Sequence, residues 1–294
     1  VIKNHIDHEL RDDEIFLPVP DEPPDGALLE QLLDTLSKGI EDLREIGHNI
    51  IFGAAALKAF RECPDAITPF RVEGLCSLID DFATTQNVSL EDDDGVPEIG
   101  NESGLVEFIF SEYLRTVTLY AGYGQGWAGH LLTMGHATIE LSRLGYPDLA
   151  TRAHKAYRMY IQTIRRGPAE SDRNIPDHPP SAVTPLDHEY WKQRKSIRSG
   201  LGHSFKYAYS FYNLLGLLKN PTLKDRCLAE SYRIFYAVLP IAGARPAIVL
   251  AWQFTKGDRS NQGDSCCWSP GPAIKAEISA STLLRLSSLM TGSP

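Results

Sequence analysis

The sequence has no long apolar run and few cysteines, and we expect no secretion signal; each of these absences excludes a class of protein. No apolar stretch approaches the ~20 residues that a membrane-spanning helix needs, so we expect no membrane partner. The N-terminal segment "VIKNHIDHELRDDEIF" is charged and lacks the apolar core of a signal peptide. The five cysteines are an odd number without framework spacing, which favours a reduced, cytoplasmic protein.

Concentrated positive charge and the common nucleotide-binding motifs are also missing. The formal net charge is −9, and no block of Lys and Arg forms a stripe, so we expect no nucleic-acid partner. We find neither a Gly-rich phosphate loop nor a nucleophile elbow. The sequence leaves the oligomeric state open.

Strand signals are almost absent, so the chain is predicted to be mainly α. Residues 1–26 are Pro-rich and are predicted to be irregular, and residues 27–294 to form a single helical domain. The segment at 105–123 also fits a pair of strands, but its length favours a helix. Helical spacing of apolar residues predicts helices at 27–43, 48–61, 70–82, 105–123, 129–144, 148–166, 187–198, 203–219, 222–239 and 273–290.

Gly-His pairs open three apolar helical segments, at His48, His130 and His203. Each predicted helix is followed by a proline, 16, 17 and 18 residues after its histidine. Proline suits the first turn of a helix, where its missing N–H costs nothing. A second amphipathic segment then follows each proline. The unit is therefore helix, proline turn, helix, and it occurs at about 46–83, 128–166 and 201–239.

This repeat predicts an array of α-hairpins, curled into an α/α bundle or toroid. In a curved arrangement the three histidine-bearing helix ends converge on one point. In a straight solenoid they form a row and are too far apart to share an ion.

The three histidines are candidate metal ligands. Neutral imidazole is the commonest protein ligand for zinc and for non-haem iron, and three such ligands leave coordination positions open for chemistry. The preceding glycine permits a sharp turn and a close approach of another group. Two other interpretations remain: a polar site without metal, and histidines that only pack between repeats. If there is a metal, we expect Fe(II), with zinc as the alternative.

Three further polar residues lie near these histidines in the sequence. His136 follows His130 by six residues and is a fourth candidate ligand. Lys206 and Tyr207 share a helix face with His203, and we take both as candidate catalytic residues. Lys206 fits a substrate anchor, a base of lowered pKa, a carbamate ligand, or a lysine that reaches past its aromatic neighbours to water.

Aromatic residues beside the histidines are candidates for substrate binding. Tyr123 and Trp127 precede His130 in "YGQGWAGH", and Phe205 follows His203. Aromatic packing alone also explains them. The Pro-rich segment 167–186 is predicted to be a long loop or a lid over an apolar cavity.

Three short segments resemble the histidine-bearing helices of the questin oxidase-like family. The matching features are His48-Asn49 in an early helix, His130 with Glu140 in a middle helix, and His203 three residues before Lys206. The family has a second histidine at the position of Met134. The resemblance implies a mononuclear non-haem iron bound by histidines, with a lysine that can be carboxylated. It also implies oxygen-dependent cleavage or Baeyer–Villiger-type insertion on an aromatic polyketide.

We therefore predict a metal-dependent oxidoreductase of the oxygenase type that acts on an apolar, aromatic or polyketide-type small molecule of secondary metabolism. With zinc, hydrolysis or lyase chemistry is more natural. Two other classes stay open. One is a metal-free α/α-toroid cyclase, lyase or glycan-acting enzyme that uses Asp80, Asp81 and Glu140. The other is a non-enzymatic helical-repeat scaffold that binds a partner on its concave face.

Overall fold

The computed structural model describes residues 20–85, 90, 94–169, 175–193 and 201–237, and these residues are mainly helical. They contain no strand. Two isolated bridges pair Arg44 with Thr84 and Tyr123 with Ile175. The helices pack against one another, so the prediction of a mainly α bundle is confirmed. The predicted helix at 273–290 and residues 1–19 lie outside the described residues.

The helix boundaries follow the predicted segments closely. Segment 105–123 is helical, as its length predicted, and the long segment at 222–239 is divided in two at Ser231. In chain order the helices are α2 (Leu28–Gly39), α3 (His48–Glu62), α4 (Pro69–Asp81), α5 (Glu102–Leu119), α6 (Gly126–Arg143), α7 (Pro147–Arg165), α8 (His188–Gln193), α9 (Leu201–Leu217), α10 (Pro221–Glu230) and α11 (Tyr232–Tyr236).

Local chemistry explains where several helices begin. Pro69, Pro147 and Pro221 occupy the first turns of α4, α7 and α10, where a missing N–H is harmless. Asn220 adds a cap, because its side chain accepts a hydrogen bond from the Leu223 N–H at 3.1 Å. Pro64 begins a short 3₁₀ turn, and α4 starts five residues later.

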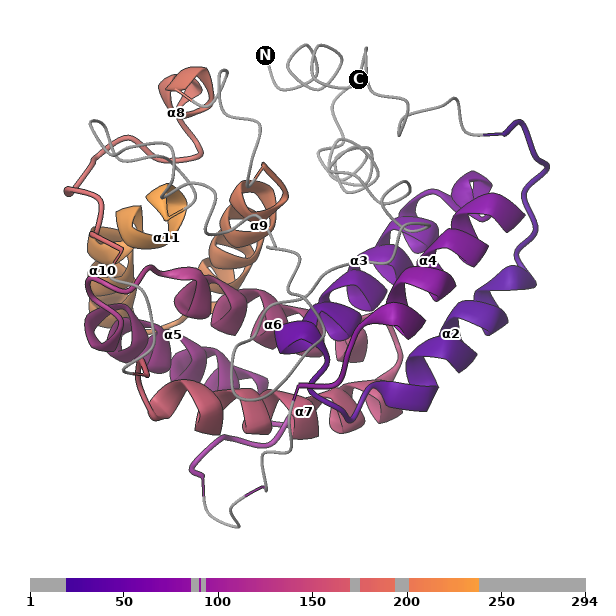
Figure 1. The fold of residues 1–294 in the computed structure, drawn as a ribbon, viewed down its shortest axis with the longest axis horizontal. Coiled ribbons are helices and arrows are strands. Elements are labelled where there is room, and N and C mark those ends of the chain that lie inside the picture. Colours follow the sequence, from indigo (N-terminus) through magenta and orange to yellow (C-terminus); the bar gives the residue numbers. More distant parts are fainter. Residues whose placement is uncertain (1–19, 86–89, 91–93, 170–174, 194–200, 238–294) are drawn as a thin grey trace, which may run out of the picture.

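Helix α6 forms the centre of the bundle (Figure 1). It contacts α3, α5, α7 and α9, and nearly all of its residues are buried. A helix that is buried on nearly every side needs neighbours around its whole circumference, and its buried polar side chains, such as His130 and His136, need partners there. The bundle curves around α6, with α2 and α4 at one end and α9, α10 and α11 at the other (Figure 1).

The three predicted repeat units differ in their packing. Helices α3 and α4 contact each other, and α6 packs closely on α7. In the third unit, α10 packs mainly on α5 instead. The first helices of the units, α3, α6 and α9, lie side by side, with α6 in the middle. The histidine-bearing helices are therefore direct neighbours.

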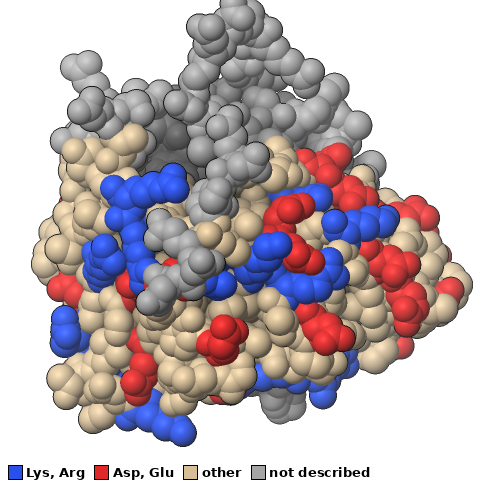
Figure 2. All heavy atoms as spheres, turned by 90° about the horizontal axis from the view of Figure 1, so that it is seen from below, with Lys and Arg blue, Asp and Glu red and all other residues tan. Residues whose placement is uncertain are grey.

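Charged side chains of both signs are interspersed on the face drawn in Figure 2. Many of them form surface ion pairs, such as Arg143 with Glu102 at 2.7 Å. Exposed pairs of this kind contribute only ~0–1 kcal/mol each. The fold therefore depends on its apolar core, in which the rings of Phe110, Tyr113 and Phe211 pack edge to face.

Candidate metal centre

The structure brings His48, His130 and His203 together at the centre of the curve. His48 is the first residue of α3, His130 the fifth of α6 and His203 the third of α9. One ligand atom from each of the three lies within 4.8 Å of the others. Among the described residues this is the only group of three or more potential metal ligands at such distances. His136 is not part of it.

Backbone carbonyls orient two of the three rings. His48 Nδ1 lies 2.5 Å from the Glu45 carbonyl oxygen, and His130 Nδ1 lies 2.8 Å from that of Gly126. A carbonyl oxygen only accepts hydrogen bonds, so each Nδ1 carries the proton and donates it. Each Nε2 is consequently a free acceptor when the ring is neutral. This arrangement is typical of metal-binding histidines.

The two acceptors face each other. His48 Nε2 and His130 Nε2 are 3.3 Å apart, and two lone pairs at that distance need a cation or a proton between them. Two nitrogens that bind one tetrahedral metal ion at about 2.0–2.1 Å are themselves roughly 3.3–3.4 Å apart. The spacing of this one pair and the nitrogen-only donor set therefore fit a zinc or ferrous ion, and the ligand atom of His203 lies within 4.8 Å of both.

Lys206 provides a cation at this point in the structure. Its Nζ lies 2.8 Å from His48 Nε2 and 3.0 Å from His130 Nε2. Part of the side chain reaches the surface, but the ammonium itself is desolvated, and this burial lowers the pKa of Lys206 to about 7. Lys206 thus lies beside both imidazoles, and its amine is directed at the two histidines; of the interpretations left open by the sequence, a lysine that reaches past its aromatic neighbours to water is not the one observed.

Burial also favours the neutral form of the imidazoles. Desolvation, and then the positive charge of Lys206, lower the pKa values of His48 and His130 well below the usual value. His48 lies against the rings of Phe52 and Phe82, at centroid distances of 5.8 and 5.9 Å. Neutral rings in an apolar setting are suited to bind a metal ion.

The turn before His48 is strained. Glu45 and Ile46 have positive φ angles of 41° and 53°, and Gly47 follows with φ 92°. Left-handed backbone costs roughly 1–2 kcal/mol for each non-glycine residue, and a β-branched residue there is a rare outlier. This conformation directs the Glu45 carbonyl at His48 Nδ1. Strain of this kind is concentrated at functional sites.

The glycines before His48 and His130 also permit close packing. A Cβ on Gly47 would overlap the Met134 thioether of α6, and one on Gly129 would overlap the Tyr207 ring of α9. Tyr207 is fully buried, and its hydroxyl lies 3.1 Å from His130 Nδ1 and 3.4 Å from the Gly126 carbonyl. Since His130 Nδ1 donates to Gly126, the hydroxyl also donates to that carbonyl. Tyr207 therefore contacts the candidate ligand His130 on its Nδ1 side, opposite the Nε2 atom that would bind a metal.

The predicted aromatic residues lie in three different environments. Tyr123 is 40% exposed and pairs with Ile175 through the backbone. Trp127 packs between Tyr120 and Tyr160, at ring distances of 6.1 and 5.9 Å. Phe205 stacks on Trp191 at 4.7 Å. Their role in substrate binding stays a prediction.

Another polar cluster, which the sequence analysis did not identify as a unit, lies further along the same three helices. Lys58 Nζ of α3 lies 3.0 Å from Glu140 Oε1 of α6, and Glu140 Oε2 lies 3.4 Å from His136 Nε2. His136 Nδ1 in turn lies 3.3 Å from the Ser210 hydroxyl of α9. One sequence feature could have identified this cluster. Lys58 and Glu140 are 82 residues apart, as are His48 and His130, so two parallel helices that bring the histidines together also bring Lys58 and Glu140 together.

Glu140 is expected to make the stability of the protein sensitive to acid. Burial alone would raise its pKa, but hydrogen bonds and charge from His136 and Lys58 lower it to about 2. A lowered folded-state pKa stabilises the fold above the unfolded value of 4.5, and this contribution is lost as the pH falls toward 2. Urea unfolding between pH 3 and 7 should show a shallower acid limb for Glu140→Gln than for the wild type. Parallel curves would contradict this prediction.

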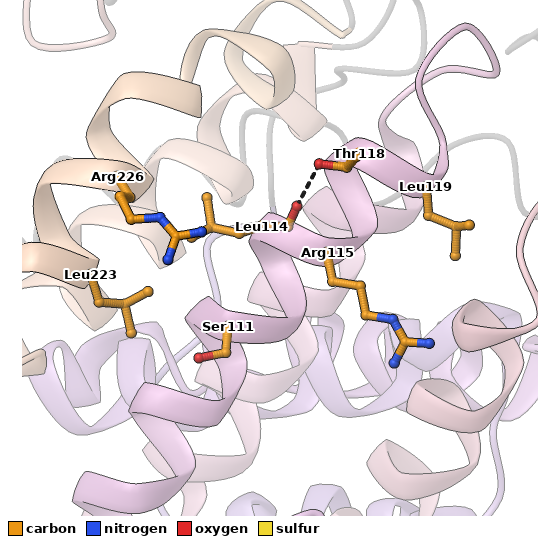
Figure 3. Close-up of a pocket in the computed structure, with 7 residues that line it drawn as sticks. All are labelled: Ser111, Leu114, Arg115, Thr118, Leu119, Leu223 and Arg226. Atoms are coloured by element: carbon orange, nitrogen blue, oxygen red, sulfur yellow. Dashed lines mark hydrogen bonds between the residues drawn. The ribbon is translucent and has the colours of Figure 1, made fainter.

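The carboxylates of the metal-free alternative are not brought together. Asp80 and Asp81 are exposed at the end of α4, whereas Glu140 is partly buried in α6 and paired with Lys58. A separate hollow of about 530 Å³ lies between α5 and α10 (Figure 3). It contains none of the predicted site residues and is lined by Ser111, Leu114, Arg115, Thr118, Leu119, Leu223 and Arg226.

Fold and site together define a helical protein with a three-histidine centre. None of the helices in the described ranges combines the length and apolar character needed to cross a membrane. No protein-family model matches the chain, and no curated protein or solved structure is significantly similar to it.

Proposed function

We propose that the chain is a metal-dependent enzyme in which His48, His130 and His203 bind one ferrous ion for an oxygenase reaction on an apolar aromatic molecule. The observation that carries the proposal is the pair of Nε2 acceptors 3.3 Å apart, with the third histidine ligand within 4.8 Å. The resemblance of the three helices to the questin oxidase-like family supports iron and an aromatic polyketide substrate. When bound, iron supplies the one-electron chemistry that activates dioxygen.

The side chains around the histidines have distinct roles in this proposal. Phe52 and Phe82 make the wall beside His48 apolar, which excludes water and suits an aromatic substrate. Tyr207 and the Gly126 carbonyl hold the His130 ring in its orientation. Lys206 extends its amine into the same space, where it holds or transfers a proton of the substrate.

The test is reconstitution of the chain with metal, after purification without chelator or immobilised nickel. We expect about one ferrous ion per chain after anaerobic addition, and oxygen uptake that depends on both iron and an added anthraquinone. Zinc-loaded protein should consume no oxygen. Failure to bind either metal would contradict the proposal. Ester or lactone hydrolysis by the zinc form, without oxygen uptake by the iron form, would replace the oxygenase with a zinc hydrolase.

Lys206→Met is expected to separate metal binding from turnover. The three histidines remain, so iron should stay bound, whereas substrate-dependent oxygen uptake should fall by roughly 100-fold or more because the proton-transferring amine is lost. Iron analysis and an oxygen electrode measure the two quantities on the same sample. Wild-type turnover in Lys206→Met would remove Lys206 from the mechanism, and loss of the iron itself would make it a ligand.

A further inference from the structure

The second polar cluster lies on the same three helices as the histidine site and in the same register. On α3 and α6, the pairs His48–His130 and Lys58–Glu140 both have a sequence separation of 82 residues. The two helices are therefore parallel, and they keep one register over ten residues, or roughly 15 Å. A slide of α3 along α6 changes both pairs together.

Helix α9 is joined to α6 in the same way. Lys206 contacts His130 across 76 residues, and Ser210 contacts His136 across 74. Lys58 also lies 5.7 Å from the centre of the Tyr209 ring of α9. Polar contacts thus connect all three ligand-bearing helices at two levels, once at the histidines and once at the Lys58 cluster.

We infer that the Lys58–Glu140 ion pair, with His136 and Ser210, is a positioning element that holds α3, α6 and α9 in the register the metal site requires. This inference rests on the proposed function. Metal–nitrogen bonds tolerate errors of only about 0.2 Å, so a small slide of one helix removes a ligand from reach. The pair also stabilises the fold through the lowered pKa of Glu140, so its effect on helix register has to be separated from its effect on general stability.

The chain offers a matched control for this inference. Arg165 and Glu112 form another partly buried pair, at 2.7 Å, whose side chains are 24% and 11% exposed. Those of Lys58 and Glu140 are 20% and 14% exposed. The control pair joins α7 to α5, and neither of these helices carries a candidate ligand. It therefore reproduces the general cost of losing an ion pair at a place that does not join two ligand-bearing helices.

The experiment compares the affinity of cobalt(II), a spectroscopic probe for nitrogen-ligand sites, across Glu140→Gln, Lys58→Met and the control Glu112→Gln. We expect the first two to bind cobalt(II) roughly fivefold to twentyfold more weakly than the wild type, with altered visible absorption bands. Glu112→Gln should stay within twofold, and Lys58→Arg, which keeps the charge pair, should recover most of the affinity.

The outcomes separate this inference from the proposed function. Equal cobalt(II) affinity in the wild type, Glu140→Gln and Lys58→Met overturns the positioning role and leaves the metal site standing. An equal loss in Glu112→Gln also overturns it, because the effect is then one of general stability. A wild-type chain that binds no cobalt(II), ferrous iron or zinc overturns the proposed function, and the positioning role with it.

Discussion

Replacing His48, His130 and His203 by alanine together is expected to abolish metal binding while the helical bundle stays folded. The three rings provide the only group of three or more potential metal ligands in the described part of the chain, and the apolar core does not depend on them. Metal at about 100 times its dissociation constant should stabilise the wild type by roughly 2.7 kcal/mol. For a chain of this size, that raises the melting temperature by roughly 4–5 °C. The triple variant should show no shift.

Elemental analysis and thermal unfolding, with and without metal, measure this effect. His154→Ala is the matched control, because His154 is also buried and bonds a backbone carbonyl, that of Pro97, at 2.9 Å. It should lower the melting temperature of the metal-free protein and still show the full metal-induced shift. A triple variant that retains stoichiometric metal would place the ligands elsewhere in the chain.

The second large effect concerns the glycine before each histidine. Gly129→Ala is expected to destabilise the protein by about 1–3 kcal/mol, because the new methyl group overlaps the buried Tyr207 ring and forces α6 and α9 apart. Gly202→Ala should instead be neutral or stabilising by up to about 1 kcal/mol. No described atom lies within 4 Å of its Cβ, and alanine is the better helix former. Urea unfolding measures both changes.

A suppressor makes the steric origin of the effect testable. Tyr207→Leu removes the ring that Gly129→Ala would meet, so the double variant should be more stable than the sum of the two single changes predicts. Additive losses would show that Gly129 acts through the helix backbone and not through its contact with Tyr207. An equal loss in Gly202→Ala would point to a requirement shared by all three Gly-His pairs.

The class of fold could be predicted from the sequence because its signals are local. Apolar spacing located α2 through α7 to within a few residues, and prolines at Pro147 and Pro221 marked helix starts. The packing of α10 on α5 could not be predicted. The sequence of α10 does not show which of several apolar helix faces in the bundle it will pack against. The repeat pattern favoured packing of α10 on α9, the first helix of its own unit.

The central site was predicted in part. The repeated Gly-His pairs identified His48, His130 and His203, and helix periodicity placed Lys206 beside them. His136 was also proposed as a ligand, but it lies in the Lys58–Glu140 cluster instead. Six residues along a helix place its side chain on a different face from His130, and only the packing of α9 decides what that face meets. The strained turn at Glu45 and Ile46 has no sequence signal at all.

The parallel arrangement of α3, α6 and α9 has a consequence for how the protein reaches its active form. Contacts between parallel neighbours join residues more than 70 positions apart, so they close long loops and form slowly. No single helical hairpin contains two of the clustered histidines, and no nascent fragment that lacks α9 can complete the centre. If the proposed metal site is correct, an ion would bind a chain that is already folded, and we expect it to slow unfolding without directing folding.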